Sequence, residues 1–81
     1  MKGHRMKFGV DLTDRQILAL KMGVTQCFAS MYRLSIEETI ELFLRYNAYD
    51  YIDRNAGLLV MHPYEYIAED VCRSLSLPVS P

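Results

Sequence analysis

The sequence predicts an all-α fold, a small orthogonal bundle of three main helices plus one short helix. Apolar residues recur at steps of three and four, which is the spacing of one face of a helix. Capping-box patterns at residues 13–16 and 35–38 mark two helix starts. The short apolar run at residues 58–61 is too brief and isolated to form a sheet.

The first helix is predicted to begin after Thr13, whose hydroxyl can accept a hydrogen bond from an early amide while Gln16 reaches back. Its apolar stripe advances in helical steps through Ile17, Leu20, Val24, Cys27, Met31 and Leu34. Four further side chains widen this face, namely Leu18, Met22, Ala29 and Tyr32. So wide a face usually packs against more than one neighbour. Gly23 within it is expected to mark a close helix crossing.

The second helix is predicted to follow Ser35, with acidic residues early in the helix that suit the positive end of its dipole. Its expected buried stripe consists of Ile36, Ile40, Phe43 and Leu44. Asn47 is a candidate C-terminal cap, because asparagine tolerates left-handed geometry. Residues 48–55 then read as the short helix, with Ile52 inward and Gly57 as its end, and residues 58–61 as an extended linker that plugs the core.

Pro63 fits the first position of the last helix, where a missing N–H costs little, and this helix is expected to reach about Leu75. The chain of 81 residues allows one domain with a small core. We therefore expect a flexible arm at residues 1–11, a single helical domain at 12–75 and a frayed tail at 76–81.

Charge is distributed unevenly along the chain although the net charge is only −1. Residues 1–34 carry six bases against two acids, whereas residues 35–70 carry eight acids against two bases. The acidic half disfavours binding to nucleic acid and favours a basic protein partner, although ordinary solvated helix faces would give the same distribution.

No apolar run approaches the roughly 20 residues that span a bilayer. The basic N-terminal stretch lacks the apolar core of a signal peptide. Cys27 and Cys72 occupy apolar-stripe positions and read as reduced, buried thiols. These features predict a cytoplasmic protein that makes no membrane contact.

Residues 35–73 also carry a family resemblance. Its pieces follow one another in the order Leu34-Ser35-Ile36-Glu37-Glu38, Glu41-Leu42-Phe43-Leu44-Arg45-Tyr46, Asp50-Tyr51-Ile52, Leu58-Leu59, His62 and Tyr66-Ile67-Ala68-Glu69-Asp70-Val71. Their order and spacing resemble the short bacterial proteins grouped as Domain of Unknown Function 3791. The resemblance implies a compact helical accessory protein that acts beside a neighbouring gene product such as a toxin-like enzyme, and it implies no catalytic residues. Pro63 departs from the family pattern, which usually has a small polar residue after the histidine.

His62 is the obvious candidate for chemistry, but a catalytic base needs an oriented partner and a pocket. Beside Pro63, its ring is instead expected to bond the exposed amides of the last helix. The sequence has no Cys-x-x-Cys or His-x-x-x-His spacing, no phosphate-binding loop and no nucleophile elbow. We therefore predict no enzymatic activity, no metal and no cofactor, with His62 and Pro63 as structural residues.

Five tyrosines fall within residues 46–66, and Tyr64 is expected in the core because it lies on the stripe of its helix. The others suit a binding patch among acidic side chains, since tyrosine brings large contact area at low entropy cost. Their rings could equally cover the small core while the hydroxyls reach water. The predicted partner-binding residues are Tyr46, Tyr49, Asp50, Tyr51, Asp53, Glu65, Tyr66 and Glu69. Glu69 can in addition pair with Arg73.

The leading hypothesis is a small protein-binding module, of adaptor or antitoxin-like type, whose acidic, tyrosine-bearing helical face docks a basic partner. The first alternative is a DNA-binding regulator resembling a helix-turn-helix around residues 33–35, although acidic residues open the helix that follows. The second alternative is a structural homodimer that pairs the wide apolar face of the first helix with its own copy.

Overall fold

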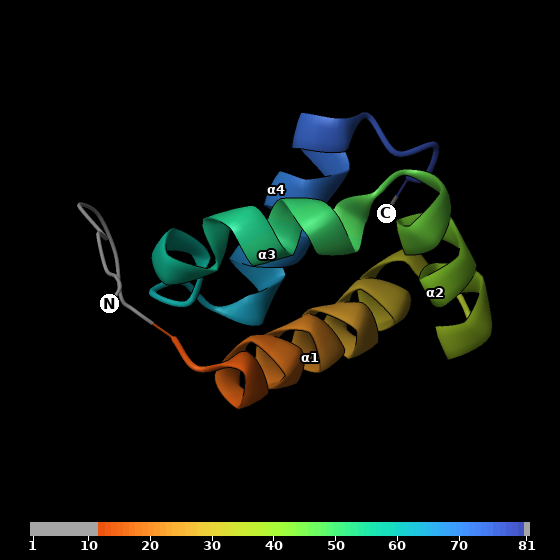
Figure 1. Ribbon diagram of the computed structural model, residues 1–81. Helices are drawn as coiled ribbons and strands as arrows, with labels where there is room; N and C mark the ends of the chain where they lie inside the picture. Colours follow the sequence, from red (N-terminus) through yellow and green to blue (C-terminus); the bar gives the residue numbers. More distant parts are fainter. Residues whose placement is uncertain (1–11, 81) are drawn as a thin grey trace.

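Four helices follow one another in the computed structural model, which describes residues 12–80 (Figure 1). They are α1 (Asp14–Tyr32), α2 (Ile36–Arg45), α3 (Ala48–Leu59) and α4 (Tyr64–Leu75). No strand occurs among the described residues, so the prediction of an all-α fold is confirmed. The predicted flexible arm at residues 1–11 and Pro81 lie outside the described part of the chain.

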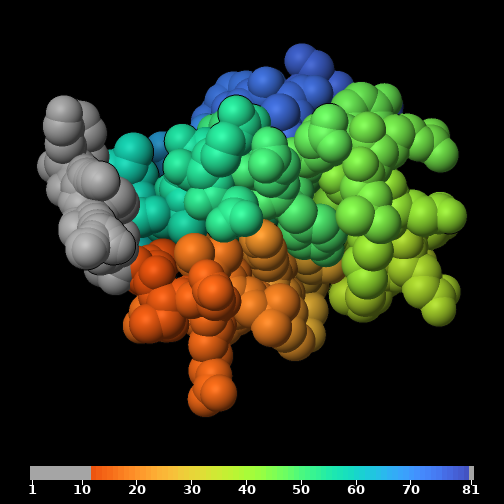
Figure 2. Space-filling view, in the orientation of Figure 1, coloured from red at the N-terminus to blue at the C-terminus, as the bar shows by residue number. Residues whose placement is uncertain are grey.

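Helix α1 is the element on which the other helices assemble, since it contacts each of the other three. Helix α3 packs between α2 and α4, which do not contact each other. In Figure 1, α3 lies across α1, α4 lies behind α3, and α2 turns away from the C-terminal end of α1. Surfaces of α1, α2 and α3 therefore share one face of the molecule (Figure 2).

Both predicted capping boxes are confirmed by their hydrogen bonds. At α1 the amide of Gln16 donates to Thr13 Oγ1 over 3.2 Å, and Gln16 Oε1 accepts from the Thr13 amide over 2.9 Å. At α2 the amide of Glu38 donates to Ser35 Oγ over 3.0 Å, and Glu38 Oε1 accepts from the Ser35 amide over 2.8 Å. Each box pairs amides that the helix itself leaves without a partner, so local sequence alone determines both helix starts.

Three chain reversals adopt left-handed geometry at residues that carry a side chain: Arg33, Asn47 and Ser76, with φ values of 59°, 59° and 53°. Asn47 has the left-handed conformation for which the sequence singled it out, and it lies between α2 and α3. After Ser76 the amide of Leu77 reaches back to the carbonyl of Cys72 over 3.0 Å, which closes the last turn of α4.

The segment after α4, predicted as a frayed tail, packs against the bundle in its described part, because Leu77 is buried in the core and Val79 packs against it. Turn geometry explains the difference, since the left-handed residue at Ser76 sends the chain back toward the bundle. Pro78 prevents continuation of the helix but leaves its two apolar neighbours free to pack.

Helix α3 is longer than predicted and passes through Gly57 to Leu59. It has twelve residues against ten in α2, so it is not the short helix of the bundle. The linker predicted at residues 58–61 is therefore wrong, because that segment is the last turn of α3 and the reversal after it. Burial of Ile52, Ala56 and Leu59 along one face outweighs the roughly 1 kcal/mol that an interior glycine costs a helix.

A chain of aromatic contacts forms the centre of the core. The rings of Phe28 on α1 and Phe43 on α2 meet edge to face with centroids 4.9 Å apart. Tyr32 lies 4.4 Å from Phe28, and Tyr49 on α3 lies 5.2 Å from Phe43. Phe28 is fully buried although it was absent from the stripe predicted for the first helix. The remaining buried core consists of Leu20, Val24, Ala48, Ile52, Ala56, Leu59, Ile67, Ala68, Val71 and Leu77.

The buried stripe predicted for the second helix is wrong in three of its four members. Phe43 is fully buried, but Ile36, Ile40 and Leu44 are 43%, 38% and 63% exposed. The second buried residue of α2 is Thr39, whose hydroxyl donates to a backbone carbonyl one turn earlier over 2.9 Å. Both neighbours of α2 lie on the side of Thr39 and Phe43, so the apolar row beside it has no cover among the described residues.

Gly23 is the site of a close contact between α1 and α4, as its sequence position suggested. The ring of Tyr64 lies directly over it, and a Cβ atom at this position would overlap that ring. Tyr64 was predicted to be core but is 44% exposed. Because Gly23 has no side chain, the Tyr64 ring packs on the surface of α1 and not in the interior.

Adjacent residues Phe43 and Leu44 test this description of α2. We expect Phe43→Ala to lower the free energy of unfolding by about 3–5 kcal/mol, because it empties the aromatic centre of the core. Leu44→Ala removes an exposed side chain and should change that free energy by less than about 0.5 kcal/mol. Urea unfolding followed by circular dichroism measures both, with Phe43→Leu as the milder variant if alanine prevents folding. Equal losses in the two alanine variants would contradict the exposure of the α2 row.

Candidate functional site

The tyrosines predicted to bind a partner take up two kinds of position. Tyr46, Tyr49 and Tyr51 are half-buried with their rings against the core, whereas Tyr66 on α4 is exposed. For the first three, the alternative that their rings cover the small core is therefore correct. Much of the surface of these three tyrosine rings is therefore already buried against the core.

Tyr51 ties α3 to α4 through a hydrogen-bonded cluster. Its hydroxyl donates to Asp70 Oδ2 over 2.7 Å and lies 3.3 Å from the Ser74 hydroxyl, which itself donates to Asp70 Oδ1 over 3.3 Å. Burial, together with the nearby Asp70 carboxylate, raises the pKa of Tyr51. The Asp70 carboxylate also lies 3.9 Å from Arg73, the residue that was expected to pair with Glu69.

The acidic residues of α3 have ion-pair partners within the chain. Asp50 lies 3.1 Å from the Nε of Arg54 one turn later, and Asp53 lies 3.5 Å from the Nζ of Lys21 on α1. These pairs offset the negative charge that sequence counting assigned to this region. A partner would have to compete for the two carboxylates.

The two glutamates of α4, Glu65 and Glu69, lie outside the cluster around Tyr51 and Asp70. Burial raises the pKa of the Cys27 thiol on α1, and the Glu65 carboxylate adds a smaller increase. The Glu69 carboxylate contributes in the same way to the raised pKa of Tyr32. Tyr66 and Asp70 line a hollow against α3 together with Tyr51, whereas Glu65 and Glu69 do not line it. The structure therefore divides the predicted binding residues among several surfaces and does not gather them on one face.

His62 does not cap the last helix as predicted, since α4 has no side-chain cap. Its exposed ring stacks on Tyr66, with ring centroids 4.1 Å apart and planes 20° from parallel. Pro63 is the N-cap of α4, one residue before its predicted position, and its carbonyl accepts from the amide of Ile67 over 3.1 Å. The structural roles of the pair are thus stacking and helix initiation.

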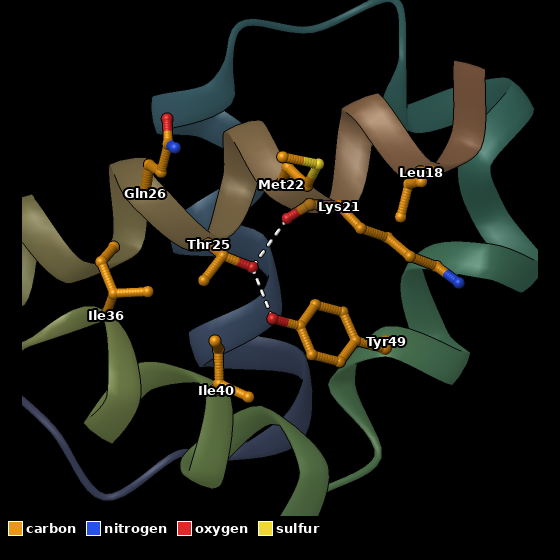
Figure 3. Close-up of a pocket in the computed structure, with 8 residues that line it drawn as sticks. All are labelled: Leu18, Lys21, Met22, Thr25, Gln26, Ile36, Ile40 and Tyr49. Carbon is orange, nitrogen blue, oxygen red and sulfur yellow. Dashed lines mark hydrogen bonds between the residues drawn. The ribbon is translucent and has the colours of Figure 1, made fainter. Parts of the chain in front are cut away.

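A groove between α1 and α2, which we call the α1–α2 groove, is a feature that sequence reasoning missed (Figure 3). It encloses about 440 Å³ and is lined by Leu18, Lys21, Met22, Thr25, Gln26, Ile36, Ile40 and Tyr49. The exposed apolar side chains of α1 and α2 form its walls. A signal for it was present, because residues 36, 40 and 44 repeat at steps of four on one side of Phe43.

The polar groups at the floor of the groove are engaged within the fold (Figure 3). Thr25 Oγ1 donates to the carbonyl of Lys21 over 2.7 Å, so its contact with the Tyr49 hydroxyl, 2.6 Å away, is donated by tyrosine. The ammonium group of Lys21 turns toward Asp53. The groove therefore presents apolar walls over a satisfied polar floor, a surface suited to contact.

Among residues 12–80, no three histidine, cysteine, aspartate or glutamate side chains cluster so as to hold a metal ion. No helix within the described range combines the length and apolar character required to cross a membrane. Comparison with known proteins finds no matching family model, no matching curated protein and no matching solved structure. The resemblance to the Domain of Unknown Function 3791 family stays a prediction.

Tyr32 has a strongly raised pKa. It lies at the C-terminal end of α1 with its ring against Phe28. Burial, followed by interactions with Cys72 and Glu69, raises the pKa of its hydroxyl from 10.0 to about 12. The folded state thus holds this proton more tightly than the unfolded state does.

Stability should fall as the pH rises from about 10 toward 12, because the unfolded chain releases the Tyr32 proton first. We expect Tyr32→Phe to flatten this decline, with a residual slope from Tyr51. Urea unfolding at pH 8, 10 and 11 measures the slope for each protein, and equal slopes for wild type and Tyr32→Phe would refute this assignment.

Proposed function

We propose that this protein is a small protein-binding module, of adaptor or accessory type, that docks its partner through the α1–α2 groove. One observation carries the proposal: large apolar side chains from two helices are exposed around a single groove. They are Leu18, Met22, Ile36 and Ile40, with Leu44 exposed just beyond the lining. A contiguous apolar patch on a small protein usually marks an interaction site, whereas single exposed apolar residues need no explanation.

The chemistry of the groove supports contact as its role. The Thr25 and Tyr49 hydroxyls at its floor are engaged with each other and with backbone, and Lys21 faces Asp53. A catalytic site needs an oriented nucleophile or base beside a place for substrate, and these groups are committed to structure. Apolar walls, in contrast, contribute roughly 25 cal/mol for each Å² that a partner covers.

The basic partner expected from sequence remains part of this proposal, but the groove replaces the tyrosine-bearing surface as its main contact. The DNA-binding alternative is weakened by geometry, because Glu37 is exposed in the first turn of α2, where a duplex phosphate would approach. Self-association is the second candidate, since the same apolar walls could cover those of another copy.

Substitutions in the groove test the proposal directly. The double variant Met22→Glu/Ile40→Glu places two charges on opposite walls and should weaken capture of a protein partner from native cell lysate at least tenfold, a loss of about 1.4 kcal/mol in binding. Met61→Glu is the matched control, because Met61 is as exposed as the groove residues but lies in the reversal after α3. Helicity and thermal unfolding should stay unchanged in both variants.

A partner that survives the groove substitutions but is lost in Glu65→Lys/Glu69→Lys would overturn the groove in favour of the acidic edge of α4. Sedimentation at tens of micromolar tests self-association, the second candidate. A mass that rises with concentration in the wild type, and not in the groove variant, would assign the groove to self-association. A constant monomer mass removes that reading.

A further inference from the structure

The two walls of the α1–α2 groove have the spacing of helix surfaces, and exposed carboxylates border the α2 wall. We infer that the occupant of this groove is an amphipathic α-helix of another protein, with lysine or arginine along the edge that faces α2. This inference rests on the proposed function and adds the secondary structure and charge of the partner to it.

Each wall of the groove is a row of residues spaced by four. Helix α1 contributes Leu18 and Met22, and α2 contributes Ile36, Ile40 and, just beyond the lining, Leu44. Four residues advance a helix by about 6 Å, so the α2 row extends over roughly 12 Å. A partner helix presents its apolar side chains at i, i+3 or i+4, and i+7 with the same rise, so three anchors can seat along such a row.

The described part of the chain makes one other common mode of peptide binding, strand addition, unavailable. An extended peptide binds by adding a strand to an open sheet edge, and residues 12–80 contain no strand. A small polar ligand would need several free hydrogen-bonding groups, but the Thr25 and Tyr49 hydroxyls at the floor already bond within the fold, which leaves Gln26 as the remaining neutral polar side chain of the lining. Apolar side chains on a helix need neither an open strand edge nor free polar groups.

Charge at the rim of the groove is confined largely to α2. Glu37 and Glu41 each follow a wall isoleucine by one residue, and the 100° turn per residue places them on the outer side of the apolar row. Both are exposed, and neither takes part in the ion pairs formed among the described residues. Two carboxylates spaced by one turn therefore border the apolar row.

The α1 rim offers less charge. The positions beyond the wall on that side are Ala19 and Ser30, with Arg15 one turn nearer the N-terminus, while Gln26 is a neutral member of the lining. Lys21 at the floor is already paired with Asp53, so it opposes a cationic partner weakly. The occupant should therefore carry its positive charge along the edge that faces α2. Such rim charges determine specificity and association rate more than total affinity.

Model peptide helices test this inference with the intact protein. We would use synthetic helices of roughly 18 residues, or five turns, with leucine at i, i+3, i+4 and i+7 and flanking positions filled by lysine, glutamate or glutamine. Fluorescence anisotropy at moderate salt gives the dissociation constants. The lysine-flanked helix should bind wild type at least about tenfold more tightly than the glutamate-flanked helix.

Charge reversal supplies the decisive control. Glu37→Lys/Glu41→Lys should invert the order of the lysine- and glutamate-flanked helices. Glu65→Lys/Glu69→Lys changes the net charge equally but lies on α4, and it should leave the order unchanged. Met22→Glu/Ile40→Glu should abolish binding of all three helices.

Two results would overturn the inference. Equal binding of the three helices, or inversion by the α4 variant as well, would show that the α2 carboxylates do not select the partner. Failure of every helix to bind would show that the occupant is not a helix of this kind. In the second case, loss of a lysate partner in the groove variant would still leave the proposed function standing, whereas no loss there would remove both.

Discussion

The edge-to-face contact between Phe28 and Phe43 is the interaction on which the rest of this structure depends. It joins α1 to α2, and Tyr49 extends it to α3. Isolated helices of ten to twelve residues are marginal in water, so α2, α3 and α4 form because they bury apolar surface against this centre and against α1. With so few residues inside, α2 needs only one buried turn, and its remaining apolar row is left at the surface. The groove is therefore a consequence of a small core.

The sequence predicted those features of the fold that short-range chemistry determines. The capping residues Thr13 and Ser35 were identifiable because each bonds a residue three positions away. The close contact at Gly23 was identifiable because a glycine inside a helix needs a reason. Burial on α2 was not identifiable, since apolar residues at 36, 40, 43 and 44 cover a wide arc and only the position of neighbouring helices decides which part is inside. The same limit applies to Phe28 and Leu77.

The candidate site was harder to predict than the fold because it depends on contacts between distant residues. Tyr49 and Tyr51 are two positions apart, which turns them about 200° around α3, so one faces α1 and the other faces α4. Their ring burial and their separate hydrogen-bond partners follow from this rotation. Charge counting placed Asp53 on an acidic surface, but its ion pair with Lys21 forms only when α3 packs on α1. Sequence spacing gave no indication of that pairing.

The three left-handed reversals of the described chain are positions where substitution could raise stability. Arg33, Asn47 and Ser76 each carry a Cβ atom where glycine has no steric penalty, and such geometry costs roughly 1 kcal/mol or more for most residues. Glycine at Arg33 or Ser76 relieves that strain without touching the groove walls. Substitutions in the groove walls that lower stability thus have compensating substitutions available at separate sites. The groove walls can therefore change in sequence while the arrangement of α1 to α4 is retained.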